Sequence, residues 1–155
     1  MKTLLKLLVS AVCLLASFSV LANEPEDTSR AGTVKTVYGP LKATGPRGER
    51  ALRPGDTVSV GDQVQVAPDG AASIVMRDGT TIVLGANAQF EVRSFAFDAR
   101  TQQGSILFAL LKGSMRMITG IIGKVSPDSV RIKTPTTTIG VLGTDFIVTA
   151  DSEAP

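Results

Sequence analysis

Four aspartates are the residues whose type and spacing most suggest chemistry. Asp56, Asp62, Asp69 and Asp78 follow one another at intervals of six to nine residues, and each stands beside a glycine. Two carboxylates can cleave a glycosidic bond, and several can hold calcium, but a calcium loop gathers its oxygen ligands within one compact stretch. Aspartate beside glycine is typical of turns, where the carboxylate accepts hydrogen bonds from nearby backbone N–H groups. We therefore interpret these four aspartates as turn residues.

Other kinds of catalytic site lack the residues that they require. The chain has no histidine, so it has neither a Ser-His nor a Cys-His nucleophile pair and no His-containing zinc site. The segment Gly120–Lys124 lacks the spacing and the Ser or Thr of a phosphate-binding loop. We predict a protein that is not an enzyme, with no catalytic residue, no cofactor and no metal site. A hydrolase built on a pair of acids is the alternative.

The first 22 residues have the pattern of a secretory signal peptide. Lys2 and Lys6 precede an uncharged apolar stretch, and Val20-Leu21-Ala22 is an acceptable cleavage site before a polar segment. A retained membrane anchor needs about 20 apolar residues, and the apolar stretch here is shorter. Lipidation of Cys13 is disfavoured because no small residue stands directly before it. We expect cleavage after Ala22 and a periplasmic or secreted protein without a stable membrane anchor.

The expected mature chain is balanced in charge. The full sequence has 16 Lys+Arg against 14 Asp+Glu, and loss of Lys2 and Lys6 leaves 14 basic residues against 14 acidic ones. This balance argues against electrostatic capture of nucleic acid or of anionic lipid. Loss of Cys13 also removes the only thiol. Stability must then come from burial and hydrogen bonds.

The rest of the chain predicts an all-β domain. From Gly32 onward, short apolar alternations rich in Val, Thr and Ile are separated by glycines, and no sustained helical spacing is present. We expect the first strand over Thr33–Tyr38. A tandem hexad, 55–60 and 61–66, repeats a Gly-Asp turn followed by an alternating strand. Stacked coils of a β-helix can have six-residue repeats, but two copies favour two ordinary successive strands.

Asp78-Gly79 predicts a hairpin. The pair separates the apolar runs Ser73–Arg77 and Thr80–Leu84, and Asp-Gly suits a type I′ turn, in which both central residues have positive φ. Both runs are apolar on their two faces, so we expect the hairpin to be covered on each side.

The most apolar stretch, 104–123, allows two interpretations. A short buried helix over Ser105–Lys112 is possible, but a turn at Lys112-Gly113 between two strands is favoured. Lys112 and Arg116 exclude a membrane span. Met115 and Met117 are expected in the core, with a soft binding surface as the alternative.

Proline and glycine mark the closing segment of the chain. Pro135 is expected to end a strand over Ser129–Lys133, because proline has no N–H. Gly140 and Gly143 are expected to mark a bend that needs unusual backbone angles or a close approach.

The order of these motifs resembles the FecR domain family over residues 55–148. The sequence has two Gly-Asp turns, an Asp-Gly-Thr hairpin, a Gly-Ser segment at 113–114 and a closing Thr-Pro…Gly-Val-x-Gly-Thr-x-Phe strand. The residues that carry the resemblance, which we expect to be structural, are Gly55, Asp56, Gly61, Asp62, Asp78, Gly79, Thr80, Thr134, Pro135, Gly140, Gly143, Thr144 and Phe146.

The resemblance implies an extracytoplasmic all-β domain, with short strands and Gly/Asp turns in a solenoid-like or roll arrangement. Some members of the family join this domain to a membrane helix and a cytoplasmic sigma-factor-binding segment, and they relay a signal from an outer-membrane transporter. Others are stand-alone exported proteins, and we expect this chain to be one of them. The family often has arginine where this chain has Leu142, so a charge-dependent role at that position is not carried over.

The predicted function is binding, through contacts with protein partners or signalling in the cell envelope. The alternative is a structural or polysaccharide-associated envelope protein without a signalling role. The expected organisation is a signal peptide over 1–22, a flexible lead-in over 23–32, the β domain over 33–149 and a C-terminal tail over 150–155.

Overall fold

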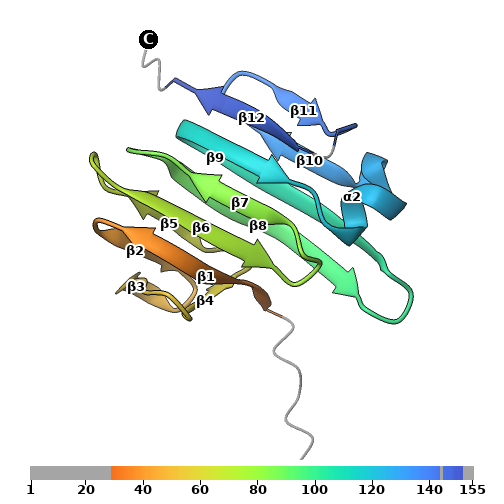
Figure 1. Ribbon diagram of the computed structural model, residues 1–155, viewed down its shortest axis with the longest axis horizontal. Helices are drawn as coiled ribbons and strands as arrows, with labels where there is room; N and C mark the ends of the chain where they lie inside the picture. Colours follow the sequence, from red (N-terminus) through yellow and green to blue (C-terminus); the bar gives the residue numbers. More distant parts are fainter. Residues whose placement is uncertain (1–28, 144, 152–155) are drawn as a thin grey trace, which may run out of the picture.

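A computed structural model describes residues 29–143 and 145–151, most of which lie in β-strands (Figure 1). The predicted signal peptide, Cys13 and Thr144 lie outside the described residues. The first strand begins at Arg30, three residues before the predicted Thr33. The elements are β1 Arg30–Tyr38, β2 Leu41–Gly45, β3 Gly48–Ala51, β4 Thr57–Ser59, β5 Gln63–Val66, β6 Ala71–Met76, β7 Thr81–Leu84, β8 Gln89–Asp98, β9 Gln103–Ile118, α2 Ile121–Val125, η1 Pro127–Ser129, β10 Val130–Lys133, β11 Thr138–Gly140 and β12 Asp145–Ala150.

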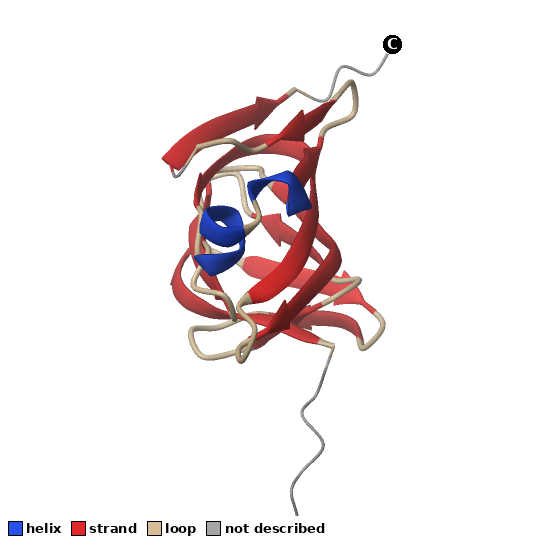
Figure 2. Cartoon of the chain, turned by 90° about the vertical axis from the view of Figure 1, so that its right-hand side faces the viewer, coloured by secondary structure: helices blue, strands red, loops and turns tan. Residues whose placement is uncertain are grey.

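The strands form one curled sheet, which confirms the all-β prediction. Its order is β3-β2-β5-β8-β9-β7-β6-β1-β4, and β10 and β12 also pair with β9, while β11 pairs with β10. All neighbours are antiparallel except β10 and β9. The coils of a β-helix stack in parallel, so this pairing does not support the solenoid arrangement. Figure 2 shows the strands curling round, with α2 and η1 at one end.

The sheet bends sharply at Gly113 of β9 and at the neighbouring residues 85–88, a line that we call the crease. The first part of β9, before the crease, pairs with β8, and its last part pairs with β7. β7 and β8 thus lie in line along β9, joined by a short corner at 85–88. This corner is hydrogen-bonded to the strands on both sides: Gly85 N donates to Ser114 O of β9 at 3.0 Å, and Val66 N of β5 donates to Ala88 O at 2.9 Å.

The predicted turn at Lys112-Gly113 is wrong, and so is the alternative helix over Ser105–Lys112. Residues 103–118 form a single strand, β9, which bends at Gly113. Gly113 has φ of +85°, a conformation that glycine adopts at little cost. A Cβ at this position would lie 2.6 Å from the Cα of Ala88. The glycine therefore bends the strand and allows a close approach, and the chain does not reverse.

The predicted hairpin at Asp78-Gly79 is confirmed, since β6 and β7 pair antiparallel. The expectation that it is covered on each side is wrong, because Ile82 and Leu84 are buried while Val83 on the opposite face is exposed. Its turn differs from the expected type I′, because only Gly79 has positive φ. Gly79 N donates to Met76 O at 3.0 Å and Met76 N to Thr80 O at 2.8 Å, which makes a three-residue loop ending in a bulge.

The two hexads form separate strands, as favoured. β4 pairs with β1, whereas β5 pairs with β2 and β8. The two strands therefore do not stack on each other as coils of a β-helix.

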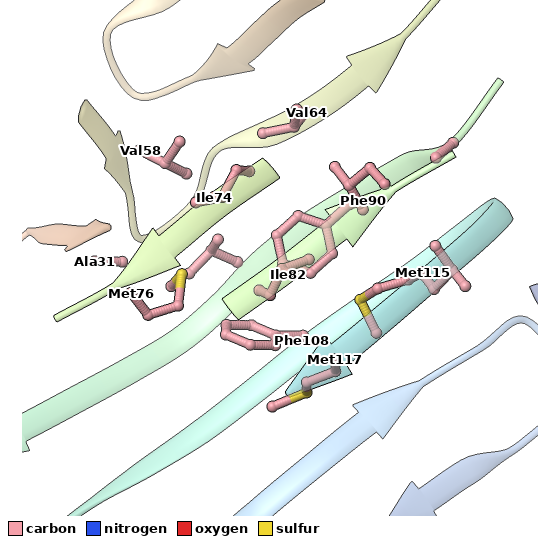
Figure 3. Packing of buried hydrophobic residues seen from close by; sticks show 14 of the residues in the cluster. Ala31, Val58, Val64, Ile74, Met76, Ile82, Phe90, Phe108, Met115 and Met117 are labelled. Carbon is pink, nitrogen blue, oxygen red and sulfur yellow. The ribbon is translucent and has the colours of Figure 1, made fainter. Parts of the chain in front are cut away.

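The core lies inside the curl. Phe90 and Phe108 meet edge to face with ring centroids 5.1 Å apart. Met115 and Met117 are fully buried, which confirms the core interpretation of the two methionines (Figure 3).

The closing segment contains the helical turns that the sequence analysis missed. α2 and η1 occupy 121–129, and β10 then ends at Lys133, two residues before Pro135, as predicted. Within residues 29–143 and 145–151, no helix is long and apolar enough to cross a membrane.

Candidate functional site: a groove over β10, β11 and β12

Asp56 and Asp62 accept backbone N–H groups at the turns where the sequence places them. Arg53 N donates to Asp56 Oδ2 at 2.7 Å, and Ser59 N donates to Asp62 Oδ2 at 2.8 Å. Asp69 lies in the turn between β5 and β6. Each of the three acids thus belongs to its own turn, and the fold does not gather them.

Asp62 also holds two edges of the sheet together. Its side chain is fully buried, and Arg50 on β3 donates to both of its carboxylate oxygens. The same guanidinium donates to Thr57 O on β4 at 3.2 Å. Arg47, 3.8 Å from Asp62, also donates to Ser59 Oγ at 2.8 Å. β3 and β4, the two ends of the sheet order, are therefore joined through side chains.

Asp78 and Thr80 fasten α2 to the β6–β7 hairpin. Asp78 is buried, and its carboxylate accepts Thr80 N–H at 3.0 Å, the Thr80 hydroxyl at 2.7 Å and Ile122 N–H at 3.4 Å. Thr80 Oγ1 in turn accepts Gly120 N–H at 3.0 Å. The family-motif pair therefore anchors the helix that follows β9.

The closing motif lies on the surface. Thr134 and Thr137 form a tight turn around Pro135, with Thr137 N donating to Thr134 Oγ1 at 3.1 Å. Gly140 ends β11, Gly143 lies in the following loop, and Phe146 on β12 is half-buried.

The expectation for Gly140 and Gly143 is wrong. Neither has positive φ, and a Cβ at either position would meet no atom within 4 Å. The backbone therefore needs glycine at neither position. Because these two glycines have no side chain, they leave open space at the surface.

That open space is part of a groove, which we call the β10–β12 groove. It consists of three hollows of about 550, 350 and 290 Å³, and neighbouring hollows share lining residues. Arg131 and Asp128 line both the first and the second hollow, and Gly140 and Leu142 line both the second and the third.

Strand alternation gives the groove a basic end. Val130 and Ile132 on β10 point into the core, so Arg131 and Lys133 point outward. The residue paired with Arg131 on β11 is Gly140, which adds no side chain there. The other strands contribute Ser94, Ser105, Leu107 and Thr138 to this hollow.

The two cations are not neutralised within the described part of the chain. Neither Arg131 nor Lys133 forms an ion pair there. Asp128 lines the groove beside Arg131. Glu91 lies on the same sheet face as Lys133 with Ala109 between them, and its carboxylate binds Arg93 at 3.1 Å.

The opposite end of the groove is apolar and exposed. Leu142 is 87% exposed and Ile147 is 70% exposed, and both line the third hollow with Phe146. Apolar side chains gathered at a surface in this way mark an interaction site more often than scattered ones do. Sequence analysis missed the groove because its lining residues come from distant parts of the chain, from Ser94 to Val148, and form one surface only in the folded sheet.

Arg116 and Asp145 form an ion pair beside the apolar end. Arg116 Nε and Nη2 donate to the two carboxylate oxygens at 2.9 and 2.6 Å. These hydrogen bonds lower the pKa of Asp145 and raise that of Arg116. The pair joins β9 to β12, the strand that carries Ile147.

Another hollow, which is not part of the β10–β12 groove, lies at the end of the curled sheet near α2 and η1. It measures about 890 Å³ and is lined by Arg77, Phe97, Asp98, Gln103 and Ser126, among others. Asp98 accepts the N–H groups of Arg100 and Thr101, and these two bonds lower its pKa. In residues 29–143 and 145–151 there is no cluster of three acidic or thiol side chains that could hold a metal ion.

Comparison with known proteins gives one family. A family model described as FecR protein matches residues 62–154, a span that contains the whole β10–β12 groove. No match was found among curated proteins or among solved structures.

Proposed function

Because the chain belongs to the FecR protein family, we propose that it is an exported, non-catalytic domain that contacts other proteins in the cell envelope. The groove is the single observation that carries this proposal. It combines exposed apolar side chains with cations that have no ion-pair partner among the described residues. Fold alone does not determine function, so the argument depends on this surface.

The buried acids support a non-catalytic role. Asp62 is bound by Arg50 and by Ser59 N–H, and Asp78 by Thr80 and Ile122, so both carboxylates serve as links between elements. A catalytic pair would have to face a shared cavity, and these two acids belong to different turns.

Export is proposed from the leader at Met1–Ala22. Expression of the full chain, followed by N-terminal sequencing of the protein in the periplasm and the medium, tests it. We expect a mature chain that begins at Asn23. Recovery of the intact chain in the membrane fraction would contradict both export and cleavage after Ala22.

The contact with other proteins is tested with a variant that fills the groove. Gly140→Phe places a ring where a Cβ meets nothing, and the backbone there does not require glycine. Gln65→Phe adds the same ring to an exposed position on β5, away from the groove. Tagged wild type and both variants are incubated with envelope extract, and captured proteins are compared by mass spectrometry.

We expect a protein that wild type and Gln65→Phe capture and that Gly140→Phe loses. If every captured protein is equally abundant with all three baits, the groove is not the binding surface and the proposal fails.

A polysaccharide-associated role is the second candidate, favoured by the hollow near α2. This hollow brings Phe97 together with planar polar side chains, Arg77, Asp98 and Gln103, which suit a hydroxyl-rich ligand. Co-sedimentation with purified cell wall separates the two candidates. Sedimentation that Gln103→Ala abolishes and Gly140→Phe leaves unchanged would favour the polysaccharide role.

A further inference from the structure

We propose that the β10–β12 groove binds an extended segment of a partner protein that carries acidic residues followed by apolar ones. This inference rests on the proposed function of the groove as a protein contact. It adds the conformation of the partner segment and the chemistry of its side chains.

The shape of the groove indicates an extended ligand. Its three hollows follow one another from β10 past β11 to β12 and share lining residues. Among the described residues, β11 pairs only with β10, so its second edge is not hydrogen-bonded to another strand. An unpaired edge can bind an extended peptide through backbone hydrogen bonds, while side-chain pockets select the sequence.

The charge of the groove indicates the acidic part. Arg131 and Lys133 stand two residues apart on one face of β10, which matches the two-residue repeat of side chains along an extended segment. Opposing charge comes from Asp128, which lines the groove, and from Glu91, which is held by Arg93. Two cations against one available carboxylate leave this end basic.

The apolar part of the partner segment is inferred from the β12 end of the groove. Leu142 and Ile147 are exposed and Phe146 is half-buried, so a partner that covers them removes apolar surface from water. The order of the partner's side chains is then set by the groove: acidic over β10 and apolar over β12.

An anionic membrane surface would also offer negative charge and an apolar phase. The hollows favour the peptide. A flat membrane surface would leave the first hollow, about 550 Å³ lined by Leu107 and Arg131, unfilled. Binding of nucleic acid would need more cations, since its affinity comes largely from the number of phosphates that Lys and Arg neutralise.

The experiment is a selection of displayed 12-residue peptides on the full purified protein. Peptides that bind are counter-selected on Gly140→Phe, so only those that need the open groove remain. Thr138→Phe, which fills the adjoining hollow of about 550 Å³ from the exposed face of β11, serves as a second blocking variant. Gln65→Phe is the matched control, and thermal unfolding verifies that each variant is folded.

We expect the remaining peptides to carry Asp or Glu near one end and large apolar residues near the other. Arg131→Glu with Lys133→Glu should weaken a synthetic peptide of this kind at least tenfold, as measured by fluorescence anisotropy. Exchange of the peptide's acids for lysine should restore binding to the charge-reversed protein. Raising the salt from 50 to 500 mM should weaken the wild-type complex.

The outcomes separate the two proposals. Peptides that need the groove but show no acidic preference, or that tolerate charge reversal, overturn this inference and leave the proposed function standing. If no peptide and no extract protein depends on Gly140, both fail. Binding of the protein to vesicles with 30% phosphatidylglycerol, lost in Leu142→Ser and Arg131→Glu, overturns the peptide in favour of a membrane surface.

Discussion

Aspartate in this protein does more than shape turns. Sequence analysis predicted Asp62 and Asp78 as turn residues, and both do accept a backbone N–H from their own turn. Their other partners could not be predicted, because Arg50 lies 12 residues before Asp62 and Ile122 lies 44 residues after Asp78. Only the folded sheet brings these groups together.

Asp78→Ala should destabilise the protein by about 2–3 kcal/mol, because it leaves buried N–H donors of Thr80 and Ile122 without an acceptor. Urea unfolding monitored by circular dichroism measures the loss. Asp78→Asn, which keeps one acceptor oxygen, is the control and should cost less. Unfolding of Asp78→Ala at the same urea concentration as wild type would contradict the prediction.

The Arg116–Asp145 pair predicts sensitivity to acid. Arg116 lowers the pKa of Asp145 in the folded state, so the ionised carboxylate favours folding above its unfolded pKa of about 3.9. That contribution is lost as the pH falls through the lowered pKa. Asp145→Asn should therefore flatten the decrease in melting temperature that occurs as the pH falls below about 4. An unchanged pH profile would contradict the assignment to this pair.

Glycine has different roles in different elements of the sheet. Gly113 in β9 adopts positive φ and lies against Ala88, whereas Gly140 in β11 does neither. Sequence analysis assigned a turn to the first and a backbone requirement to the second. Both errors have one cause: whether a glycine bends, turns or merely opens space depends on the neighbouring strand, which local sequence does not specify.

Gly113→Ala should destabilise the protein by about 3 kcal/mol, from left-handed backbone strain of about 1–2 kcal/mol and overpacking against Ala88. Gly48 is the matched control, since it has φ of +81° and its Cβ would meet nothing within 4 Å. Gly48→Ala should cost only the backbone term. Equal losses in chemical denaturation would mean that the close approach at the crease contributes nothing.

At the scale of the whole molecule, the sequence predicts well which adjacent strands pair, and it predicts poorly how distant strands meet to close the curled sheet. The β6–β7 hairpin and the stop before Pro135 are confirmed. The pairing of β1 with β6 and the link between β3 and β4 through Arg50 depend on contacts between distant parts of the chain. Alternation and turn residues carry no information on which distant strands meet.

Arg50→Ala should destabilise the closed sheet by about 3 kcal/mol, because it leaves the carboxylate of Asp62 buried with a weaker partner. Lys42→Ala on the neighbouring strand removes an exposed ion pair with Glu49 and should cost less than about 1 kcal/mol. Equilibrium denaturation compares them, and hydrogen exchange should increase at β4 in Arg50→Ala alone. Similar losses would show that Arg50 does not hold the edges together.

The uninterrupted course of β9 has a consequence for how the protein comes apart. Residues 103–112 pair on one side of the crease and residues 113–118 on the other, so one strand supplies hydrogen bonds to both halves. If either half unfolds, the other half loses the support of β9, the strand that supplies its central hydrogen bonds. The molecule should therefore lose its structure in a single cooperative transition, and a fragment cut at the bend should retain neither half.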